Sequence, residues 1–183
     1  MLPIFATERL ILRPRTMRDL AASIAMDDDP LVIRFIEVPW SDAASHTAFV
    51  MARIAHRYPP GLGYWSVFEG GDRPAFLGWI LLTPLDLVGP EIEIGWRLTR
   101  AAWGKGYGTE AAAPVLRHGF ETVGLDRVIA DIDRANSASR RVAEKLGLRP
   151  IVEDQKRPRA VRYGLTAPPI SSRVRSAHRV ASR

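Results

Sequence analysis

The chain has 183 residues, 46% of them hydrophobic and 25% charged, with no cysteine and a formal net charge of +6. This length and composition predict one soluble globular domain, and the absence of cysteine excludes disulfides, thiolate metal sites and a cysteine nucleophile. No apolar run approaches the ~20 residues of a membrane span, and the N-terminus lacks a signal-peptide pattern, so we expect a cytoplasmic protein without a membrane partner.

The positive charge gathers at the C-terminal end. Residues 167–183 hold four arginines and no acidic residue, and they account for four of the six net charges. This segment is also rich in proline and serine, a composition typical of a solvated, disordered tail. We therefore expect a folded domain over residues 1–166 and a basic tail over 167–183. A tail that binds RNA or acidic lipid is the alternative, but no stacking-aromatic motif supports nucleic acid as a partner.

The N-terminal third predicts a strand followed by two helices. Residues 8–14 have a strand pattern that ends at a proline. A helix is expected over 16–26, with Thr16 as N-cap and Asp19 in the capping-box position. A second helix is expected over 41–57, where following prolines end the pattern.

A meander of strands comes next. Strands are predicted over 64–69 and 75–83, with a hairpin-like turn at 70–72, and over 91–98 after a connection at 84–90. The last strand alternates strictly, which assigns its residues to two faces. One face carries Ile92, Ile94, Trp96 and Leu98, and the other carries Glu91, Glu93, Gly95 and Arg97.

The C-terminal half alternates helices and strands. An amphipathic helix runs to about Val123, although Pro114 fits it only in the first turn or at a bend. A strand over 127–133, a helix over 136–146 and a strand over 161–166 follow. Strands before and after both helices predict two βαβ crossovers appended to the meander, in an α/β domain.

A glycine-rich turn at residues 103–110 joins strand to helix. Gly104, Gly106 and Gly108 stand at alternate positions, where glycine permits positive φ and close approach of a ligand to the backbone. Amides at a helix start carry partial positive charge, so the turn predicts a phosphate site. It matches neither the Walker loop nor the GxGxxG dinucleotide fingerprint, so another phosphate ligand is indicated.

Together with other segments, this turn resembles a known family. Residues 103–111 are similar to the acetyl-CoA pyrophosphate loop of GNAT-fold N-acetyltransferases, in the branch of the ribosomal-protein-alanine N-acetyltransferases. Residues 8–13, 93–96 and 136–147 resemble that branch's first strand, central strand and last conserved helix, in the same order. The resemblance implies a mixed, mostly antiparallel sheet with flanking helices and a splayed central strand pair.

The resemblance also implies how acetyl-CoA is held as cosubstrate. Amides of the loop would hold the pyrophosphate, Lys105 would add charge at its rim, and the main chain of 96–98 would pair with the pantetheine arm. Asn136 would contact the cofactor, although helix capping accounts for it equally well. The implied cofactor-binding residues are Trp96, Arg97, Leu98, Trp103, Gly104, Lys105, Gly106, Tyr107, Gly108, Thr109 and Asn136.

Acetyl transfer to an amine requires removal of a proton. Glu93 is the expected base, acting through water, with Glu91 as the fallback and an ordinary solvated carboxylate as the alternative. Ser139 is expected to protonate the departing thiolate, or else to serve in the helix cap. Gly95 and main-chain amides would polarise the thioester carbonyl. The absence of cysteine favours direct transfer in a ternary complex, and scattered histidines predict no metal site.

The acceptor implied by the resemblance is a protein N-terminal amine. A small-molecule amine and a catalytically silent acyl-CoA-binding domain are the alternatives. Among the aromatic residues that could border the acceptor site, Phe35, Trp40, Tyr64 and Trp65, we nominate Trp40. His118 is expected to be a packing or surface residue rather than a base. Relatives of this kind are monomers or homodimers.

Overall fold

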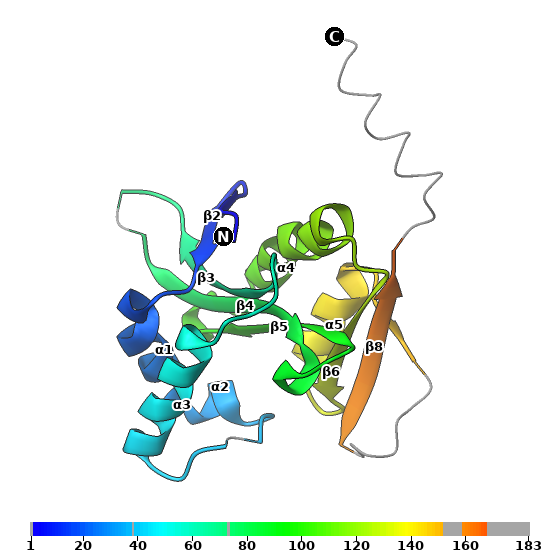
Figure 1. The fold of residues 1–183 in the computed structure, drawn as a ribbon. Helices are drawn as coiled ribbons and strands as arrows, with labels where there is room; N and C mark the ends of the chain where they lie inside the picture. Colours follow the sequence, from blue (N-terminus) through cyan, green and yellow to red (C-terminus); the bar gives the residue numbers. More distant parts are fainter. Residues whose placement is uncertain (1, 38, 73, 152–158, 168–183) are drawn as a thin grey trace.

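The computed structural model describes residues 2–37, 39–72, 74–151 and 159–167. Within these residues one sheet of eight strands runs in the order β1-β2-β3-β4-β5-β6-β8-β7, with helices on both faces (Figure 1). The tail expected over 167–183 lies outside the described residues except for Ala167. The strands are β1 (Phe5–Ala6), β2 (Leu10–Pro14), β3 (Gly63–Glu69), β4 (Phe76–Pro84), β5 (Ile92–Leu98), β6 (Arg127–Asp133), β7 (Arg149–Pro150) and β8 (Ala160–Thr166).

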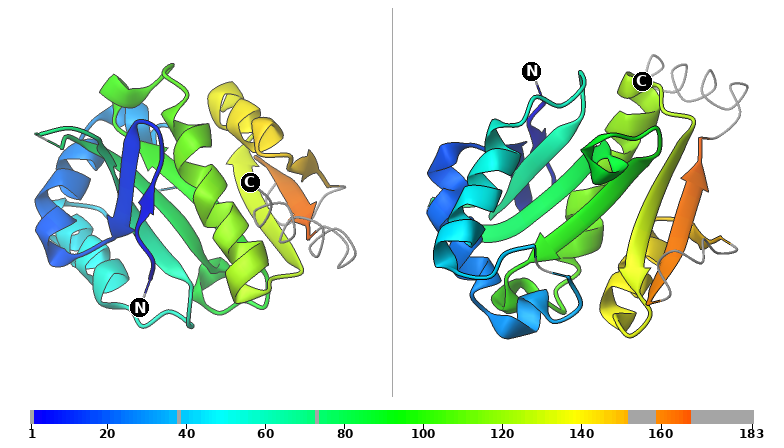
Figure 2. Two further views of the ribbon diagram at one scale, coloured as in Figure 1. Left: turned by 90° about the horizontal axis from the view of Figure 1, so that it is seen from above. Right: turned by 60° about the horizontal axis from the view of Figure 1, so that its bottom comes forward.

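The helices form two groups. α1 to α3 cover one face of the sheet, and α4 and α5 cover the other (Figures 1 and 2). None of the helices in the described residues is both long and apolar enough to cross a membrane. The α-helices are α1 (Leu20–Asp27), α2 (Pro30–Ile33), α3 (Ala43–Ala55), α4 (Tyr107–His118) and α5 (Ser137–Lys145); short 3-10 turns lie at Met17–Asp19, Leu85–Leu87 and Arg100–Ala102, and a π-helical turn at Gly119–Val123.

The strand directions confirm one predicted crossover and correct the other. β1 to β5 are successively antiparallel, and β5 and β6, joined through α4, are parallel. After α5, however, the chain forms the short strand β7 at the sheet edge, and β8 then enters between β6 and β7, antiparallel to both. The prediction of a second βαβ unit that ends in the strand over 161–166 was therefore wrong. The chain leaving α5 enters the short strand β7, which was not predicted, and β8 runs antiparallel to β6.

Local signals explain most helix boundaries. The capping box of Thr16 and Asp19 is present, and Asp42 caps α3 by accepting from the Ser45 amide at 2.8 Å. Pro114 lies inside α4 beyond its first turn, so this helix lacks one internal hydrogen bond there. The helical pattern continues through the π-helical turn and ends at Gly124, which has a φ of 80°.

Side chains on the two sheet faces pack into two separate clusters. The larger one lies under α4 and α5 and includes Leu12, Trp65 and Ile94 of the sheet, each at most 1% exposed. The smaller one joins Met26 and Val32 of the first helices to Trp79 and Leu81 of β4. As predicted for β5, Ile94 faces the large cluster. Its neighbours Glu93 and Arg97 face the helices α1 to α3 and line a cavity there.

The parallel strands β5 and β6 pair only near their starts. The ladder joins Glu93 to Ile129, and beyond that point the two strands diverge toward their C-terminal ends (Figure 2, right). This is the splayed central strand pair that the sequence resemblance implied. In α/β sheets, ligands bind outside the carboxyl ends of strands where the chain order changes direction.

Candidate active site

The glycine turn forms the start of α4, beside the open end of β5. Gly104 and Gly106 have φ values of 74° and 83°, in the left-handed region that favours glycine. The first helical hydrogen bond runs from the Glu110 amide to the Gly106 carbonyl, at 3.1 Å. The amides of Tyr107 and its two successors precede that bond, so the helix itself does not satisfy them. The turn therefore presents a group of donors suited to an anion.

Gly108 serves a different purpose from the other two glycines. It lies within α4, and a Cβ added there would lie 3.3 Å from a methyl group of Val142 and 3.6 Å from one of Leu98. Glycine at this position lets α4 pack closely against α5 and β5. A Cβ on Gly104, by contrast, would meet nothing within 4 Å, so this part of the turn is open to a ligand.

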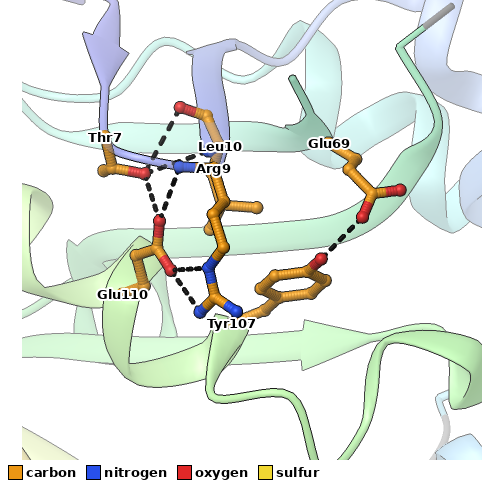
Figure 3. A network of polar contacts seen from close by, with 6 residues as sticks. All are labelled: Thr7, Arg9, Leu10, Glu69, Tyr107 and Glu110. Carbon is orange, nitrogen blue, oxygen red and sulfur yellow. Dashed lines mark hydrogen bonds and ion pairs between the residues drawn. The ribbon is translucent and has the colours of Figure 1, made fainter. Parts of the chain in front are cut away.

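A polar network fixes the start of α4 to the N-terminal strands (Figure 3). Glu110 accepts from the Thr7 hydroxyl at 2.6 Å, from the Arg9 amide at 3.0 Å and from the Arg9 Nε at 2.8 Å. The Arg9 guanidinium also lies 4.6 Å from the centroid of the Tyr107 ring, whose hydroxyl donates to Glu69 at 2.6 Å. The network positions the glycine turn from both sides.

The same network changes the acidity of Glu110. Burial raises the pKa of its carboxyl, but the hydrogen bonds from Thr7 and Arg9 outweigh burial, so the pKa lies below the ordinary value. Sequence reasoning missed this network, because its partners are 38 to 103 positions apart in the chain. Its one sequence signal is an acidic residue in the first helical turn, which the helix dipole also favours.

Other loop residues lie where the sequence placed them. The exposed Trp103 donates its indole N–H to the Leu98 carbonyl at 2.9 Å, which fastens the loop to the end of β5. Lys105 is exposed, with its Nζ 5.9 Å from the centroid of the Tyr107 ring. Thr109 is partly buried in the first turn of α4.

The main chain of β5 alternates between two neighbours. The amide of Thr99 donates to Leu77 in β4 at 2.9 Å, and hydrogen-bonded pairs recur at every second residue of an antiparallel ladder. By this alternation the backbone groups of Arg97 and Gly95 face β4, whereas those of Trp96 and Leu98 face the gap toward β6. We expected the Arg97 main chain to pair with the pantetheine arm and Gly95 to polarise the thioester carbonyl. In this ladder the backbone groups of both residues face β4 instead.

The start of α5 faces the same gap. Asn136 caps this helix, with its side-chain oxygen accepting from the Ser139 amide at 3.1 Å. The Ser139 hydroxyl accepts a hydrogen bond from the Trp96 indole at 3.3 Å. Capping is thus present at Asn136, and the Ser139 hydroxyl lies beside β5 in the region where the strands separate.

A cavity of about 380 Å³ opens on the opposite face, beneath α1 to α3. Glu93 and Arg97 line it from β5, and Trp40 lines it from the segment before α3, as does Tyr64 from β3. Trp65 is fully buried in the large cluster and donates to the Pro3 carbonyl at 2.8 Å. Of the nominated aromatic residues, Trp40 and Tyr64 therefore reach the cavity, while Trp65 packs in the core and Phe35 is not part of the lining.

Buried charges shape the floor of this cavity. Asp27 binds Arg97 through one oxygen at 2.8 Å and His46 through the other at 3.2 Å. The His46 ring stacks on Trp40 with centroids 4.1 Å apart, so the network holds that indole at the cavity wall. Glu91, the fallback base, is instead paired with Arg162 at 2.7 Å and is not part of the lining.

His118 is a packing residue, as the sequence predicted. It is 8% exposed, lies 2.9 Å from the Gly61 carbonyl, and packs its ring against Phe5 and Trp65. Trp65 belongs to the large cluster and Phe5 packs against it, so His118 lies on the face opposite the cavity.

Comparison with known proteins identifies the family. The family model described as an acetyltransferase (GNAT) domain matches residues 9–149. The chain belongs to the GNAT acetyltransferase family. This match contains both the glycine turn and the splayed strands, and it agrees with the fold and activity class that the sequence resemblance implied.

Relatives of this GNAT chain carry acetyltransferase names. YnaD of Bacillus subtilis, an uncharacterized N-acetyltransferase, is 42% identical over 147 residues, which cover 78% of this chain and 81% of YnaD. FsC-acetyl coenzyme A-N(2)-transacetylase of Aspergillus fumigatus is 30% identical over 155 residues. That alignment covers 80% of this chain but only 65% of the fungal protein's length.

Solved structures give the same fold. The acetyltransferase from Agrobacterium tumefaciens superposes with a TM-score of 0.76 at 27% identity, over 90% of this chain and 95% of that one. Spermidine N-acetyltransferase from Vibrio cholerae, solved with CoA and spermine, has a TM-score of 0.69 at 14% identity, over 87% and 96% of the two chains. At that identity the second likeness supports the fold alone.

Proposed function

We propose that this GNAT protein transfers the acetyl group of acetyl-CoA directly to a primary amine. The observation that carries the proposal is the position of the glycine turn. Its free helix-start amides lie at the end of β5, where β5 and β6 separate. A phosphate group at the turn and an extended arm along β5 can therefore belong to one ligand.

The residues of the turn fit the pyrophosphate of acetyl-CoA. Gly104 and Gly106 leave space for it, the amides of Tyr107, Gly108 and Thr109 supply hydrogen bonds, and Lys105 adds charge at the rim. Along the arm, the backbone groups of Trp96 and Leu98 face the gap and would pair with the pantetheine amides. Trp103 is proposed to position Leu98 through its indole hydrogen bond, and Asn136 to contact the ligand from α5.

Two side chains are proposed for the proton transfers. Acetyl-CoA supplies a thioester, and the amine nitrogen forms a bond to its carbonyl carbon as the carbon–sulfur bond breaks. Glu93, on the cavity face of β5, takes the proton that the amine loses, directly or through water. Ser139, beside Trp96 in the gap, passes a proton to the thiolate that leaves and takes one up from water. The Trp96 amide, which faces the gap, can donate to the carbonyl oxygen as charge develops.

The acceptor enters from the cavity beneath α1 to α3, on the face where Glu93 lies. A protein N-terminal amine is our first candidate, because the sequence resembles the branch of ribosomal-protein N-acetyltransferases. A small-molecule amine is the second, because the cavity of about 380 Å³ matches the size of small-ligand sites. The spermidine acetyltransferase that shares this fold is an example of that second class.

The decisive experiment is titration of acetyl-CoA into the purified protein by calorimetry, with two matched variants. Gly106→Trp places a large side chain at the turn, and Gly124→Trp places the same side chain at another exposed glycine of nearly equal φ, 80° against 83°. Both substitutions place a side chain at a positive φ, and a Cβ at either position would meet no atom closer than 3.6 Å. We expect micromolar binding that Gly106→Trp loses and Gly124→Trp keeps.

Two results would contradict the proposal. Absence of acetyl-CoA binding by the parent protein would remove the phosphate site. Binding without turnover of any amine, in a screen of peptides, polyamines and amino acids, would instead favour a catalytically silent acyl-CoA-binding domain.

A further inference from the structure

Arg15 lies at the acceptor cavity and not in the proposed cofactor site. It follows β2 directly, and its amide donates to the Tyr64 carbonyl at 2.9 Å, which extends the pairing with β3 by one residue. Its side chain lines the cavity that contains Glu93. Together with Arg53 and Tyr64, it also lines a neighbouring cavity of about 250 Å³. Arg15 and Arg53 therefore stand at the boundary between two cavities.

Arg15 differs from the other arginines on this sheet face. Arg13, two residues earlier, binds both oxygens of Asp19 at 2.9 and 2.6 Å, and Arg97 binds Asp27 at 2.8 Å. Arg15 forms no salt bridge among the residues that the structure describes, and its Nε is buried there without a hydrogen-bond partner. Its guanidinium instead lies over two aromatic rings, 5.4 Å from the centroid of Tyr64 and 5.9 Å from that of Trp79.

Burying a cation without a partner anion has an unfavourable free energy. Burial lowers the pKa of the Arg15 guanidinium, but arginine remains protonated in proteins, so the charge persists. The nearby carboxylate of Asp27 already engages Arg97 and His46. The flat guanidinium, oriented by Tyr64 and Trp79, is consequently prepared to bind a planar anion that enters the cavity.

The cavity also carries negative charge at other positions of its lining. Glu93 lies on β5, and Glu37 and Asp86 lie on the connections that border the cavity. Arg15 and Glu93 stand three strand spacings apart, a lateral separation of roughly 14 Å. Opposite charges at separate positions suit an acceptor that is itself a zwitterion.

We infer that the acceptor carries a carboxylate near the reacting amine, and that Arg15, assisted by Arg53, binds this carboxylate while the amine reaches Glu93. Two sources offer this chemistry: a free amino acid, and a peptide N-terminus with an acidic residue close behind it. Polyamines lack the anion that Arg15 would bind. The inference rests on the proposed function, whose acceptor class it narrows.

The test measures binding of acceptors that differ only in the carboxylate. In the presence of CoA, free α-amino acids are compared with their carboxamides, and amidated tripeptides with aspartate second are compared with their asparagine counterparts. Dissociation constants are measured by calorimetry. We expect the carboxylate form in at least one pair to bind at least about tenfold more tightly than its amide. A preference in the amino-acid series indicates a free amino acid as acceptor, and a preference in the tripeptide series indicates a peptide N-terminus.

Two variants assign the preference to Arg15. Arg15→Gln removes the charge at the cavity, whereas Arg18→Gln removes the same charge from an exposed position on the first 3-10 turn. We expect Arg15→Gln to abolish the preference for the acid and Arg18→Gln to keep it, with CoA affinity unchanged in both. A preference that survives Arg15→Gln, or no preference in any pair, overturns the inference. Loss of acetyl-CoA binding by the parent would instead overturn the proposed function.

Discussion

Residues of the same type have different structural roles in the candidate site. Gly104 and Gly106 adopt positive φ and leave the turn open, while Gly108 is needed because Val142 and Leu98 pack against it. The arginines divide in the same way: Arg97 is neutralised by Asp27 within the fold, and Arg15 is not paired among the described residues. Residue type and spacing alone do not separate these duties.

The neighbouring glutamates Glu91 and Glu93 allow a sharp test of the proposed base. Glu93→Gln is expected to lower kcat about 10²–10⁴-fold, because a positioned base contributes that much, and to leave the acetyl-CoA dissociation constant unchanged. Glu91→Gln is the control, because Glu91 is paired with Arg162 and does not line the cavity. Steady-state kinetics and calorimetry measure the two effects. Equal losses in both variants would mean that Glu93 has no special role.

At the scale of elements, the start of α4 depends on the charge of Glu110. Its folded-state pKa is lowered, so the carboxylate form stabilises the fold at pH values above the ordinary carboxyl pKa of about 4.3. That contribution is lost as the pH falls through the lowered folded-state value. Wild type should therefore lose its stability advantage over Glu110→Gln on acidification below about pH 4.3.

Urea unfolding at a series of pH values from 3 to 7 measures this difference. Glu121→Gln, at an exposed position in the π-helical turn after α4, is the matched control and is expected to follow wild type throughout. A wild-type advantage over Glu110→Gln that stays constant down to pH 3 would show that the network does not depend on this charge.

Most individual elements were predictable because their signals are local. The strand over 127–133 has the same bounds in the structure, and Thr16 and Asn136 lie at helix starts as expected. The short helix α2 was missed, although Asp29 as N-cap before Pro30 is a recognisable start. The predicted parallel pairing of the strand over 161–166 was wrong. Strand order and direction depend on which sheet edge is unpaired when the chain reaches it, and the local sequence does not specify this.

At the scale of the whole molecule, we propose that the folded domain ends near Ala167. The amide of Ala167 donates to the Asp126 carbonyl at 2.8 Å, which closes the end of β8 onto the turn before β6. Removal of residues 168–183 is therefore expected to leave the thermal midpoint and the acetyl-CoA dissociation constant unchanged. Calorimetry of the shortened chain checks both. A midpoint lower by several degrees would show that the tail contributes to the fold.

The sequence by itself determined the α/β class, the glycine turn at the start of a helix and the alternating faces of β5, since each depends on residues within one or two elements. Only the tertiary structure decided which residues distant in sequence are in contact. It pairs Arg9 with Glu110 and Asp27 with Arg97, and it places Arg15 in the lining of the cavity that contains Glu93. The residues of the first two pairs are 101 and 70 positions apart in the chain. Such long-range contacts depend on strand order, register and packing, which local patterns in a single chain do not specify.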